Sequence, residues 1–239
     1  MNAPLRTKFA SGNKFIAVER YDALGEDPHP ALILLHGADG MRFKIFADRY
    51  RKVARSLATC GYNVYLPHYF HRTSTIVTNH PDMVKNFPTW TETVKDCVSF
   101  VLEQGKSAGK GVALVGFSLG ASLVLAQAAQ DSRIAAAVEV FGAVPDWLVS
   151  SMQNMPPLLI LHGSKDWLVP VSDAHKLEGA LKTNGHRYQM HIYENEGHGF
   201  SEPTNYDALT RAQAFLSEHF PASIHVSSAE SGQDKESAG

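Results

Sequence analysis

Ser118 is the residue whose neighbours point most clearly to covalent chemistry, because Gly116-Phe-Ser118-Leu-Gly120 fits the pattern G-x-S-x-G. The pattern follows the apolar run Gly111 to Val115, which is typical of a strand, and precedes a stretch that is typical of a helix. The glycines permit a sharp strand-to-helix turn that holds the hydroxyl clear of the backbone, and the helix start stabilises negative charge nearby. The alternative is a glycine-lined turn with an incidental serine. We predict that Ser118 is a nucleophile.

A base and an acid must accompany this serine, because its hydroxyl is a weak nucleophile at neutral pH. Asp166 follows the apolar run Leu158 to Leu161, and His198 follows the run Tyr188 to Tyr193. If both runs are parallel strands, the two side chains lie at the carboxyl edge of the sheet, where ligands bind in open α/β sheets. The chain order serine, acid, histidine then predicts a triad of Ser118, Asp166 and His198.

Other side chains compete for these roles. The sequence holds twelve histidines, among which His186 precedes the last apolar run and His191 lies inside it. Asp173 is a rival acid one turn into the next predicted helix, and Asp166 itself fits a solvated loop carboxylate or a helix cap. The glycines that flank His198 suit a loop that approaches a substrate closely, which favours His198 as the base.

Two backbone N–H groups are expected to stabilise the oxyanion of an acyl-transfer intermediate. Leu119, which follows the nucleophile, supplies one of them in this arrangement. The second is expected from the loop His36-Gly37-Ala38-Asp39-Gly40, whose glycines let the backbone approach a substrate, and Ala38 is the donor that we predict. We interpret His36 as a structural residue that holds this loop by a hydrogen bond.

Short apolar runs alternate with amphipathic stretches along the chain, which predicts a doubly wound, mostly parallel α/β sheet. The predicted strands are Ala31 to Leu35, Tyr62 to Leu66, Gly111 to Val115, Ala135 to Val140, Leu158 to Leu161 and Tyr188 to Tyr193. The predicted helices are Phe43 to Leu57, one that begins at a Thr89-x-x-Glu92 capping box, Leu119 to Gln130, Ser172 to Thr183 and Pro203 to His219. Strand ends in such a sheet would position all three triad candidates at one edge.

Two stretches depart from this alternation. Residues 68–88 are long for a connection within a compact domain, so we expect either a substrate-contacting loop or a poorly ordered insert. Residues 221–239 are rich in Ser, Gly and charged side chains, and we expect a disordered tail there. Residues 1–220 are then expected to form one domain, since α/β folds of about 200 residues or more are common as single units.

The composition bounds the class of partner. Of the 239 residues, 44% are apolar and 19% are charged, with a formal net charge of −2, which is typical of a globular protein. This balance argues against nucleic-acid or anionic-membrane binding, which depends on dense basic patches, so we expect a small-molecule partner. No apolar run is long enough for a signal peptide or a membrane span, and we expect a cytoplasmic monomer.

Neither the two cysteines nor the pair His68 and His71 has a complete metal-ligand pattern. Cys60 and Cys97 have neither a zinc nor a disulfide pattern, and both are expected to be buried. His68 and His71 have HxxH spacing but no carboxylate partner on a supporting helix. We therefore predict no metal and no cofactor.

The sequence resembles the dienelactone hydrolase family of α/β-hydrolases from about residue 30 to 216. The resemblance is carried by the segments LLHGADG, GYNVYLPHYFHR, VGFSLGAS, ILHGSKDWLVP and YENEGHGF. It implies the α/β-hydrolase fold without a cap domain, which agrees with the short interval between Phe141 and Pro157, where many relatives insert a cap. It also implies hydrolysis of lactones or small carboxylic esters without a metal or a cofactor.

The sequence differs from the founding pattern of that family at three places. Ser118 stands where the dienelactone-specific members have cysteine, and Gly37 stands where a glutamate accompanies that cysteine. Arg72 matches a family arginine that grips the substrate carboxylate, but Glu202 stands where a second arginine is found. The resemblance implies that Arg72, Gly37 and Glu202 lie at the substrate. It favours a neutral or singly charged ester over dienelactone itself.

We therefore expect a serine hydrolase that acts on small carboxylic esters or lactones through an acyl-enzyme. A thioesterase or a peptidase would use the same triad. A non-catalytic ligand-binding protein with this fold is a further alternative, since a fold does not fix a function. An intact set of serine, acid and histidine favours the enzymes over the binding protein.

Overall fold

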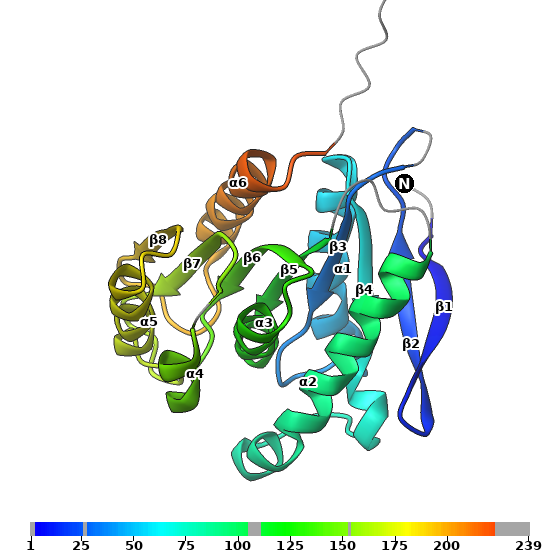
Figure 1. The fold of residues 1–239 in the computed structure, drawn as a ribbon, viewed down its shortest axis with the longest axis horizontal. Coiled ribbons are helices and arrows are strands. Elements are labelled where there is room, and N and C mark those ends of the chain that lie inside the picture. The colour runs from blue at the N-terminus through cyan, green and yellow to red at the C-terminus, as the bar shows by residue number, and fades with distance from the viewer. Residues whose placement is uncertain (1–2, 26–27, 105–110, 153, 223–239) are drawn as a thin grey trace, which may run out of the picture.

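The computed structural model describes residues 3–25, 28–104, 111–152 and 154–222. In this part of the chain the strands form one eight-stranded sheet with the order β1-β2-β4-β3-β5-β6-β7-β8 (Figure 1). Their bounds are β1 Leu5–Ser11, β2 Lys14–Tyr21, β3 Ala31–Leu35, β4 Asn63–Pro67, β5 Val112–Phe117, β6 Ile134–Val140, β7 Leu158–Gly163 and β8 Tyr188–Tyr193. β2 pairs antiparallel with β1 and β4, and the other neighbours pair in parallel. The predicted mostly parallel sheet is confirmed.

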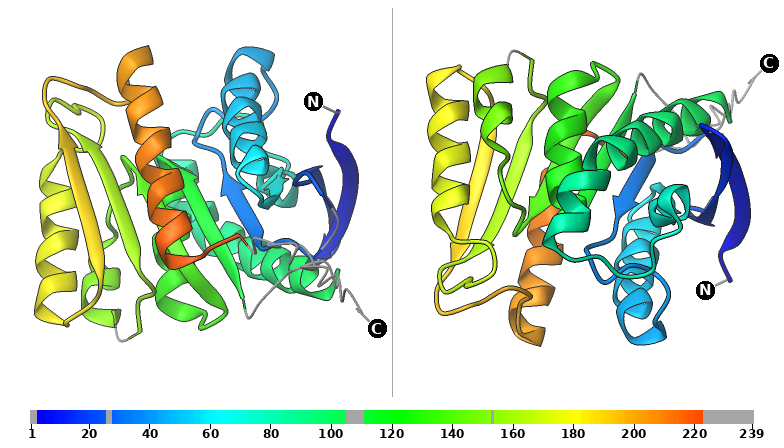
Figure 2. Two further views of the ribbon diagram at one scale, coloured as in Figure 1. Left: turned by 90° about the horizontal axis from the view of Figure 1, so that it is seen from above. Right: turned by 90° about the horizontal axis from the view of Figure 1, so that it is seen from below.

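Helices cover both faces of the sheet (Figure 2). One face packs against α1 Lys44–Thr59 and α6 Glu202–His219, and the other against α2 His80–Glu103, α3 Leu119–Gln130, α4 Asp146–Ser151 and α5 Ser172–Thr183. A short 3-10 helix, η1 Tyr69–Thr73, follows β4. Between β6 and β7 the described chain contains α4 and no other helix or strand, so no cap domain covers the sheet there.

The central strands have no polar face because helices bury both of their sides. Every residue of β3 is buried; Ile33 and Leu35 belong to the core on one side of the sheet, and Leu32 and Leu34 to the core on the other. Each such side chain contributes about 1.5–3 kcal/mol relative to an exposed one. The carboxyl ends of the strands are therefore a rigid edge on which turns can hold reactive side chains.

The segment 68–88 is largely helical, which corrects the expectation of a long loop or a poorly ordered insert. η1 forms directly after β4, and α2 begins at His80, upstream of the predicted Thr89-x-x-Glu92 box. The Asn79 side chain caps this helix by accepting a hydrogen bond from the Asp82 N–H at 3.0 Å. The true cap thus lies nearly three helical turns earlier than the capping-box pattern suggested.

Pro88 lies inside α2 without ending it. A proline frees the carbonyl four residues earlier, here that of Val84, and the exposed side of the helix at Val84 lets water bind that carbonyl. The sequence analysis also missed β1, β2 and α4. Cys97 is buried as predicted, but Cys60 is exposed, because it lies just after the end of α1. Of the predicted tail, residues 223–239 lie outside the described residues.

Candidate active site

Ser118 occupies a strained turn between β5 and α3. Its backbone has φ 53° and ψ −120°, a combination that residues other than glycine rarely adopt. The Ser118 N–H donates to Val140 O at 2.9 Å, and the Ser118 carbonyl accepts from the N–H groups of Ala121 and Ser122. These bonds hold the turn in place at the carboxyl end of β5, so the hydroxyl stands clear of the backbone.

Two glycines make this turn sterically possible. A Cβ at Gly116 would lie 2.3 Å from Gly120 O, and a Cβ at Gly120 would lie 2.5 Å from the carbonyl oxygens of Leu35 and His36. Gly120 therefore packs the start of α3 directly onto the end of β3. The serine turn and the loop after β3, which supply the two predicted oxyanion donors, are fixed to each other by this contact.

His198 and Asp166 complete a chain of hydrogen bonds with Ser118. His198 Nε2 lies 2.9 Å from Ser118 Oγ, and His198 Nδ1 lies 2.8 Å from Asp166 Oδ2. Because a carboxylate only accepts hydrogen bonds, Nδ1 carries the proton and Nε2 presents its lone pair to the serine hydroxyl. The structure thus brings together the three side chains that the sequence singled out.

Asp166 is fixed from several sides. Its second oxygen, Oδ1, accepts from the N–H groups of Leu168 at 2.9 Å and Val169 at 2.8 Å. The Asp166 side chain is 0% exposed, whereas that of His198 keeps 15%. His162 lies 3.5 Å from Asp166 Oδ2 but donates to Val169 O at 2.9 Å, and burial lowers the pKa of His162, which keeps it neutral. His198 is therefore the histidine that this carboxylate orients.

Phe141 shields the histidine on one side. It follows β6 with φ 46°, and its ring meets the His198 ring edge-on at 4.8 Å. The turn after Phe141 is held by Glu139, whose Oε2 accepts from the Gly142 N–H at 2.9 Å. Burial raises the pKa of Glu139 to about 8, so this side chain is a neutral acid at pH 7. The turn thereby places an apolar ring, without an added charge, against His198.

The competing acid and bases are engaged elsewhere. Asp173 Oδ2 accepts from the Val144 N–H at 3.0 Å. His186 Nε2 donates to Met152 O at 3.1 Å, and His191 lies within β8, half-buried. Within the described ranges none of the three bonds to the serine or to its partners. The geometry favours His198 and Asp166 over these alternatives.

The two predicted oxyanion donors flank the serine turn. Leu119 begins α3 and Ala38 lies in the loop after β3; in the described part of the chain neither N–H group has an acceptor. The Gly37 N–H, by contrast, is taken by Tyr50 Oη at 2.9 Å. The Ala38 carbonyl accepts from the Thr78 N–H at 3.1 Å, which fixes the orientation of the loop. Both N–H groups are thus available to an acceptor, and their role as oxyanion donors stays a prediction, whereas the Gly37 N–H is occupied by Tyr50.

His36 holds this loop, as predicted. Its Nδ1 donates to Gly37 O at 2.8 Å, and its ring stacks on Tyr69 with the ring centres 4.1 Å apart. Tyr69 Oη in turn donates to His36 O at 2.7 Å. Burial lowers the pKa of His36 to about 3, so the ring is neutral at physiological pH.

Comparison with known protein families matches residues 18–220 to the dienelactone hydrolase family. The chain belongs to the dienelactone hydrolase family. Its fold is that of a candidate dienelactone hydrolase from Klebsiella pneumoniae subsp. pneumoniae MGH 78578, with a TM-score of 0.75 and 18% identity over 91% of this chain and 100% of that one. The dienelactone hydrolase-like promiscuous phosphotriesterase P91 from metagenomic libraries is as similar, with a TM-score of 0.75 and 17% identity over 91% and 99% of the two chains. These likenesses show the α/β-hydrolase fold.

An esterase is related in sequence to this dienelactone hydrolase family member. Esterase YpfH of Escherichia coli (strain K12) is 25% identical over 133 residues, which make up 56% of each protein. The match thus spans about half the length of that esterase. Among the described residues, no helix combines the length and the apolar character that crossing a bilayer requires, and no group of three or more His, Cys, Asp or Glu is placed to hold a metal ion.

The substrate contacts implied by the family resemblance are not all at the triad. Arg72 is directed to the turn between β1 and β2, where its Nη1 lies 3.3 Å from Asn13 Oδ1 and its guanidinium covers Gly12. Successive residues of a 3-10 helix point about 120° apart, so η1 turns Arg72 away from the side that carries His71. Glu202 begins α6 as an exposed residue, where its charge suits the helix dipole.

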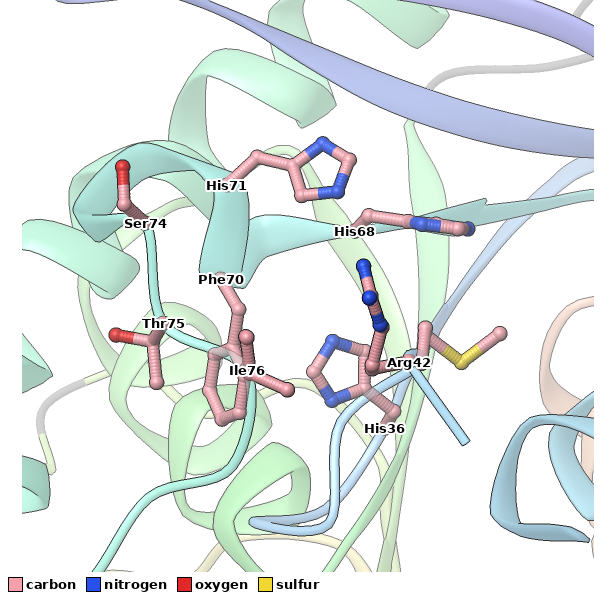
Figure 3. A pocket seen from close by; sticks show the side chains of 9 residues that line it. His36, Arg42, His68, Phe70, His71, Ser74, Thr75 and Ile76 are labelled. Carbon is pink, nitrogen blue, oxygen red and sulfur yellow. The ribbon is translucent and has the colours of Figure 1, made fainter. Parts of the chain in front are cut away.

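A cavity of about 370 Å³ lies beside the loop after β3 (Figure 3). No sequence pattern predicted it. His36 and Arg42 from this loop line it, together with His68 and His71 from the segment after β4. In the sequence, only the HxxH spacing of His68 and His71 distinguishes any of these residues. No local pattern joins Arg42 to them, because the two segments meet only in the folded sheet.

Proposed function

We propose that this protein hydrolyses small carboxylic esters or lactones, with Ser118 as the nucleophile, His198 as the general base and acid, and Asp166 as the residue that orients His198. The proposal rests on one observation above all: the unbroken chain from Ser118 Oγ to His198 Nε2 at 2.9 Å and from His198 Nδ1 to Asp166 Oδ2 at 2.8 Å. The related esterase of Escherichia coli supports an ester as the substrate.

The geometry supports a two-stage reaction. Ser118 Oγ attacks the carbonyl carbon while its proton moves to His198 Nε2, and the carbonyl oxygen becomes an oxyanion between the N–H groups of Leu119 and Ala38. The tetrahedral intermediate collapses, the bond to the leaving alkoxide breaks, and His198 protonates the alkoxide. A water molecule then gives its proton to His198 and attacks the acyl-enzyme, which releases the acid and restores Ser118.

Each part of the site is expected to contribute a separable amount. One oxyanion donor is worth about 3 kcal/mol of barrier in comparable enzymes. Asp166 fixes the tautomer in which His198 Nε2 is unprotonated, and without that tautomer the base cannot accept the serine proton. Phe141 covers one side of the imidazole and limits its contact with water, which strengthens the interaction between His198 and Asp166.

The test is hydrolysis of 4-nitrophenyl butyrate by the wild-type protein and by Ser118→Ala. We expect kcat to fall by a factor on the order of a million, because members of a triad act as a unit. Ser150→Ala is the control, since Ser150 is an exposed serine on α4 whose Oγ donates to Trp147 O. Folded Ser118→Ala protein that retains more than about a hundredth of the wild-type kcat would place the nucleophile at another residue.

A further inference from the structure

Tyr50 is a buried side chain of α1 that the proposed reaction does not use. Its hydroxyl extends to the loop after β3, where Tyr50 Oη accepts a hydrogen bond from the Gly37 N–H at 2.9 Å. The same hydroxyl donates to Asp39 Oδ1 at 2.6 Å. Tyr50 thus bonds to both chain neighbours of Ala38, the residue whose N–H is a predicted oxyanion donor. We call this pair of bonds the Gly37–Tyr50–Asp39 bridge.

The peptide bond between Gly37 and Ala38 sets the direction of the Ala38 N–H. A trans peptide bond points its C=O and its N–H in opposite directions. Gly37 O accepts from His36 Nδ1 at 2.8 Å and from the Gly40 N–H at 3.1 Å. These two donors hold the carbonyl on one side of the loop, so the Ala38 N–H faces the other side. Its direction therefore depends on how firmly the two flanking residues are held.

The bridge holds the loop at a point where a glycine leaves the backbone free to turn. Gly37 has no side chain of its own that could fix its conformation. A Cβ at Gly37 would lie 3.0 Å from Tyr50 Oη and 3.3 Å from Asp39 Oδ1, so the backbone closes tightly around the hydroxyl. Removal of this hydroxyl breaks the bonds on both sides of Ala38 at once.

Tyr50 also contacts the strand end that carries the nucleophile. The Tyr50 ring lies against the ring of Phe117, the residue before Ser118, with the ring centres 5.7 Å apart. The Cβ position of Gly37 that lies 3.0 Å from Tyr50 Oη is also 3.4 Å from Phe117 O. Tyr50 thus joins the loop after β3 to the end of β5. A loop released from Tyr50 would change the distance between the Ala38 N–H and Ser118 Oγ.

Asp39 gives the bridge its direction. A tyrosine hydroxyl has one proton to donate and can accept hydrogen bonds through its lone pairs. Because the Tyr50 proton goes to Asp39 Oδ1, a lone pair of the same oxygen is left for the Gly37 N–H. A carboxylate is a stronger acceptor than a neutral group, which favours this orientation of the hydroxyl.

We propose that Tyr50 is a positioning residue for ester hydrolysis, which with Asp39 as its acceptor holds the Ala38 N–H toward the oxyanion of the tetrahedral intermediate. The inference rests on the proposed ester hydrolysis and adds a residue that acts through the Ala38 N–H rather than on the substrate itself. The oxyanion is fully formed only after Ser118 attacks. Loss of the bridge therefore lowers kcat and leaves KM nearly unchanged.

The first experiment compares two variants that each remove one buried tyrosine hydroxyl, with 4-nitrophenyl butyrate as the substrate. Tyr50→Phe should lower kcat by about tenfold, less than the loss of a whole oxyanion donor, and should leave KM within about twofold. Tyr62→Phe is the matched control, because Tyr62 Oη donates to Phe220 O at 3.0 Å and Tyr62 directly precedes β4, at the end of the parallel strands away from Ser118.

The control separates positioning from stability. Tyr62→Phe also deletes a hydrogen bond of a buried hydroxyl, so a comparable fall in the denaturation midpoint is expected for both variants. Tyr62→Phe should nevertheless keep kcat within about twofold of the wild-type value. If both variants lower kcat equally, or if Tyr50→Phe raises KM and leaves kcat unchanged, the inference is overturned.

Two substitutions of Asp39 test its part in the bridge. Asp39→Asn keeps an oxygen that can accept from Tyr50 Oη, so kcat should stay within about threefold of the wild-type value. Asp39→Ala removes the acceptor and should lower kcat about as much as Tyr50→Phe. The double variant Tyr50→Phe/Asp39→Ala should be no slower than either single variant, because both changes break the same bridge. Equal losses in Asp39→Asn and Asp39→Ala would contradict the role of Asp39 as the acceptor.

Amide hydrogen exchange, followed by NMR on the full chain without substrate, separates this inference from the proposed function. Tyr50→Phe should speed exchange of the Gly37 N–H by about tenfold or more, because this N–H loses its acceptor, and Tyr62→Phe should leave it unchanged. Wild-type protein that hydrolyses no ester would refute the proposed function, whereas faster Gly37 exchange in Tyr50→Phe would still support the bridge. Unchanged Gly37 exchange in folded Tyr50→Phe protein would overturn the inference.

Discussion

The candidate triad and the cavity at the loop after β3 are built in opposite ways. Asp166 accepts hydrogen bonds from three protein donors, and His198 is bonded at both ring nitrogens. In the cavity, Arg42 lacks a carboxylate partner and His36 Nε2 lacks any partner within the described ranges. The first arrangement is fully hydrogen-bonded within the protein, whereas the second leaves a buried nitrogen without a partner in the described residues. The candidate triad thus belongs to a rigid edge of the sheet, and the cavity belongs to the loop after β3 and the segment around η1.

The difference follows from the elements that carry each region. The triad residues sit at or just after the ends of β5, β7 and β8, whose positions are fixed by a core on both faces of the sheet. The cavity is lined by the loop between β3 and α1 and by the segment around η1. We therefore expect changes at the triad to act on kcat or on stability.

The largest effect is expected from the histidine of the triad. His198→Ala should lower kcat for a neutral ester by a factor on the order of a million, and the double variant with Ser118→Ala should be no slower, because the two side chains act as a unit. Steady-state kinetics on 4-nitrophenyl butyrate measures this. If the losses in kcat were multiplicative in the double variant, Ser118 and His198 would act independently, which would contradict a triad that acts as a unit.

A large loss of stability is expected from the glycine that joins α3 to β3. A Cβ at Gly120 would stand 2.5 Å from two backbone oxygens, so Gly120→Ala should lower the free energy of unfolding by about 3–5 kcal/mol. Gly179→Ala is the matched control, because a Cβ there meets open space within α5 and should raise stability by about 0.5–1 kcal/mol. Urea denaturation of both variants checks this; equal effects would mean that the serine turn tolerates displacement.

A pH-dependent effect is expected from Glu139, the acid beneath the turn that carries Phe141. Burial raises the pKa of Glu139 from 4.5 to about 8, so the folded state retains a proton that the unfolded state has lost between these pH values. Stability relative to Glu139→Gln should therefore fall as pH rises from about 5 to about 8, by about 1.4 kcal/mol per pH unit at most, and level off above that. Denaturation midpoints at several pH values measure it. Parallel profiles for the two proteins would contradict a buried neutral acid.

The smallest effect is expected at Arg72. Because its guanidinium contacts Asn13 and covers Gly12 at an exposed turn, Arg72→Ala should lower stability by less than about 1 kcal/mol and leave KM for charged and neutral esters within about twofold. A selective rise in KM for a negatively charged ester, such as 4-nitrophenyl hydrogen glutarate, with Arg72→Ala would assign substrate recognition to Arg72.

The sequence predicted the meeting of Ser118, Asp166 and His198 but not the cavity at the loop after β3, for a physical reason. Ser118, Asp166 and His198 each follow an apolar strand, and parallel strands deliver their carboxyl ends to one edge, so local pattern implies spatial proximity. The cavity has no such rule: Arg42 comes from the loop after β3 and His71 from η1, and their approach depends on how η1 packs against β2 and α2. The family resemblance alone placed Arg72 at the substrate, but the geometry of η1 determines the direction of its side chain.

The missed elements have equally local causes. β1 forms a hairpin with β2, and most of its residues are exposed. Its sequence therefore has no apolar run that predicts a strand. Prolines are unfavourable within helices, yet Pro81 occupies the first turn of α2, where a missing N–H costs nothing, and Pro88 lies inside α2 without ending it. The secondary structure of these segments depends on tertiary packing rather than on local sequence pattern.

The central claim, that Ser118 is activated by His198, is tested most directly by locating the covalent adduct of a fluorophosphonate probe. Peptide mass spectrometry of the labelled wild-type protein should show one adduct, on Ser118, and folded His198→Ala protein should label far more slowly under the same conditions. Folded wild-type protein that remains unlabelled, or that carries the adduct on a different residue, would contradict the account.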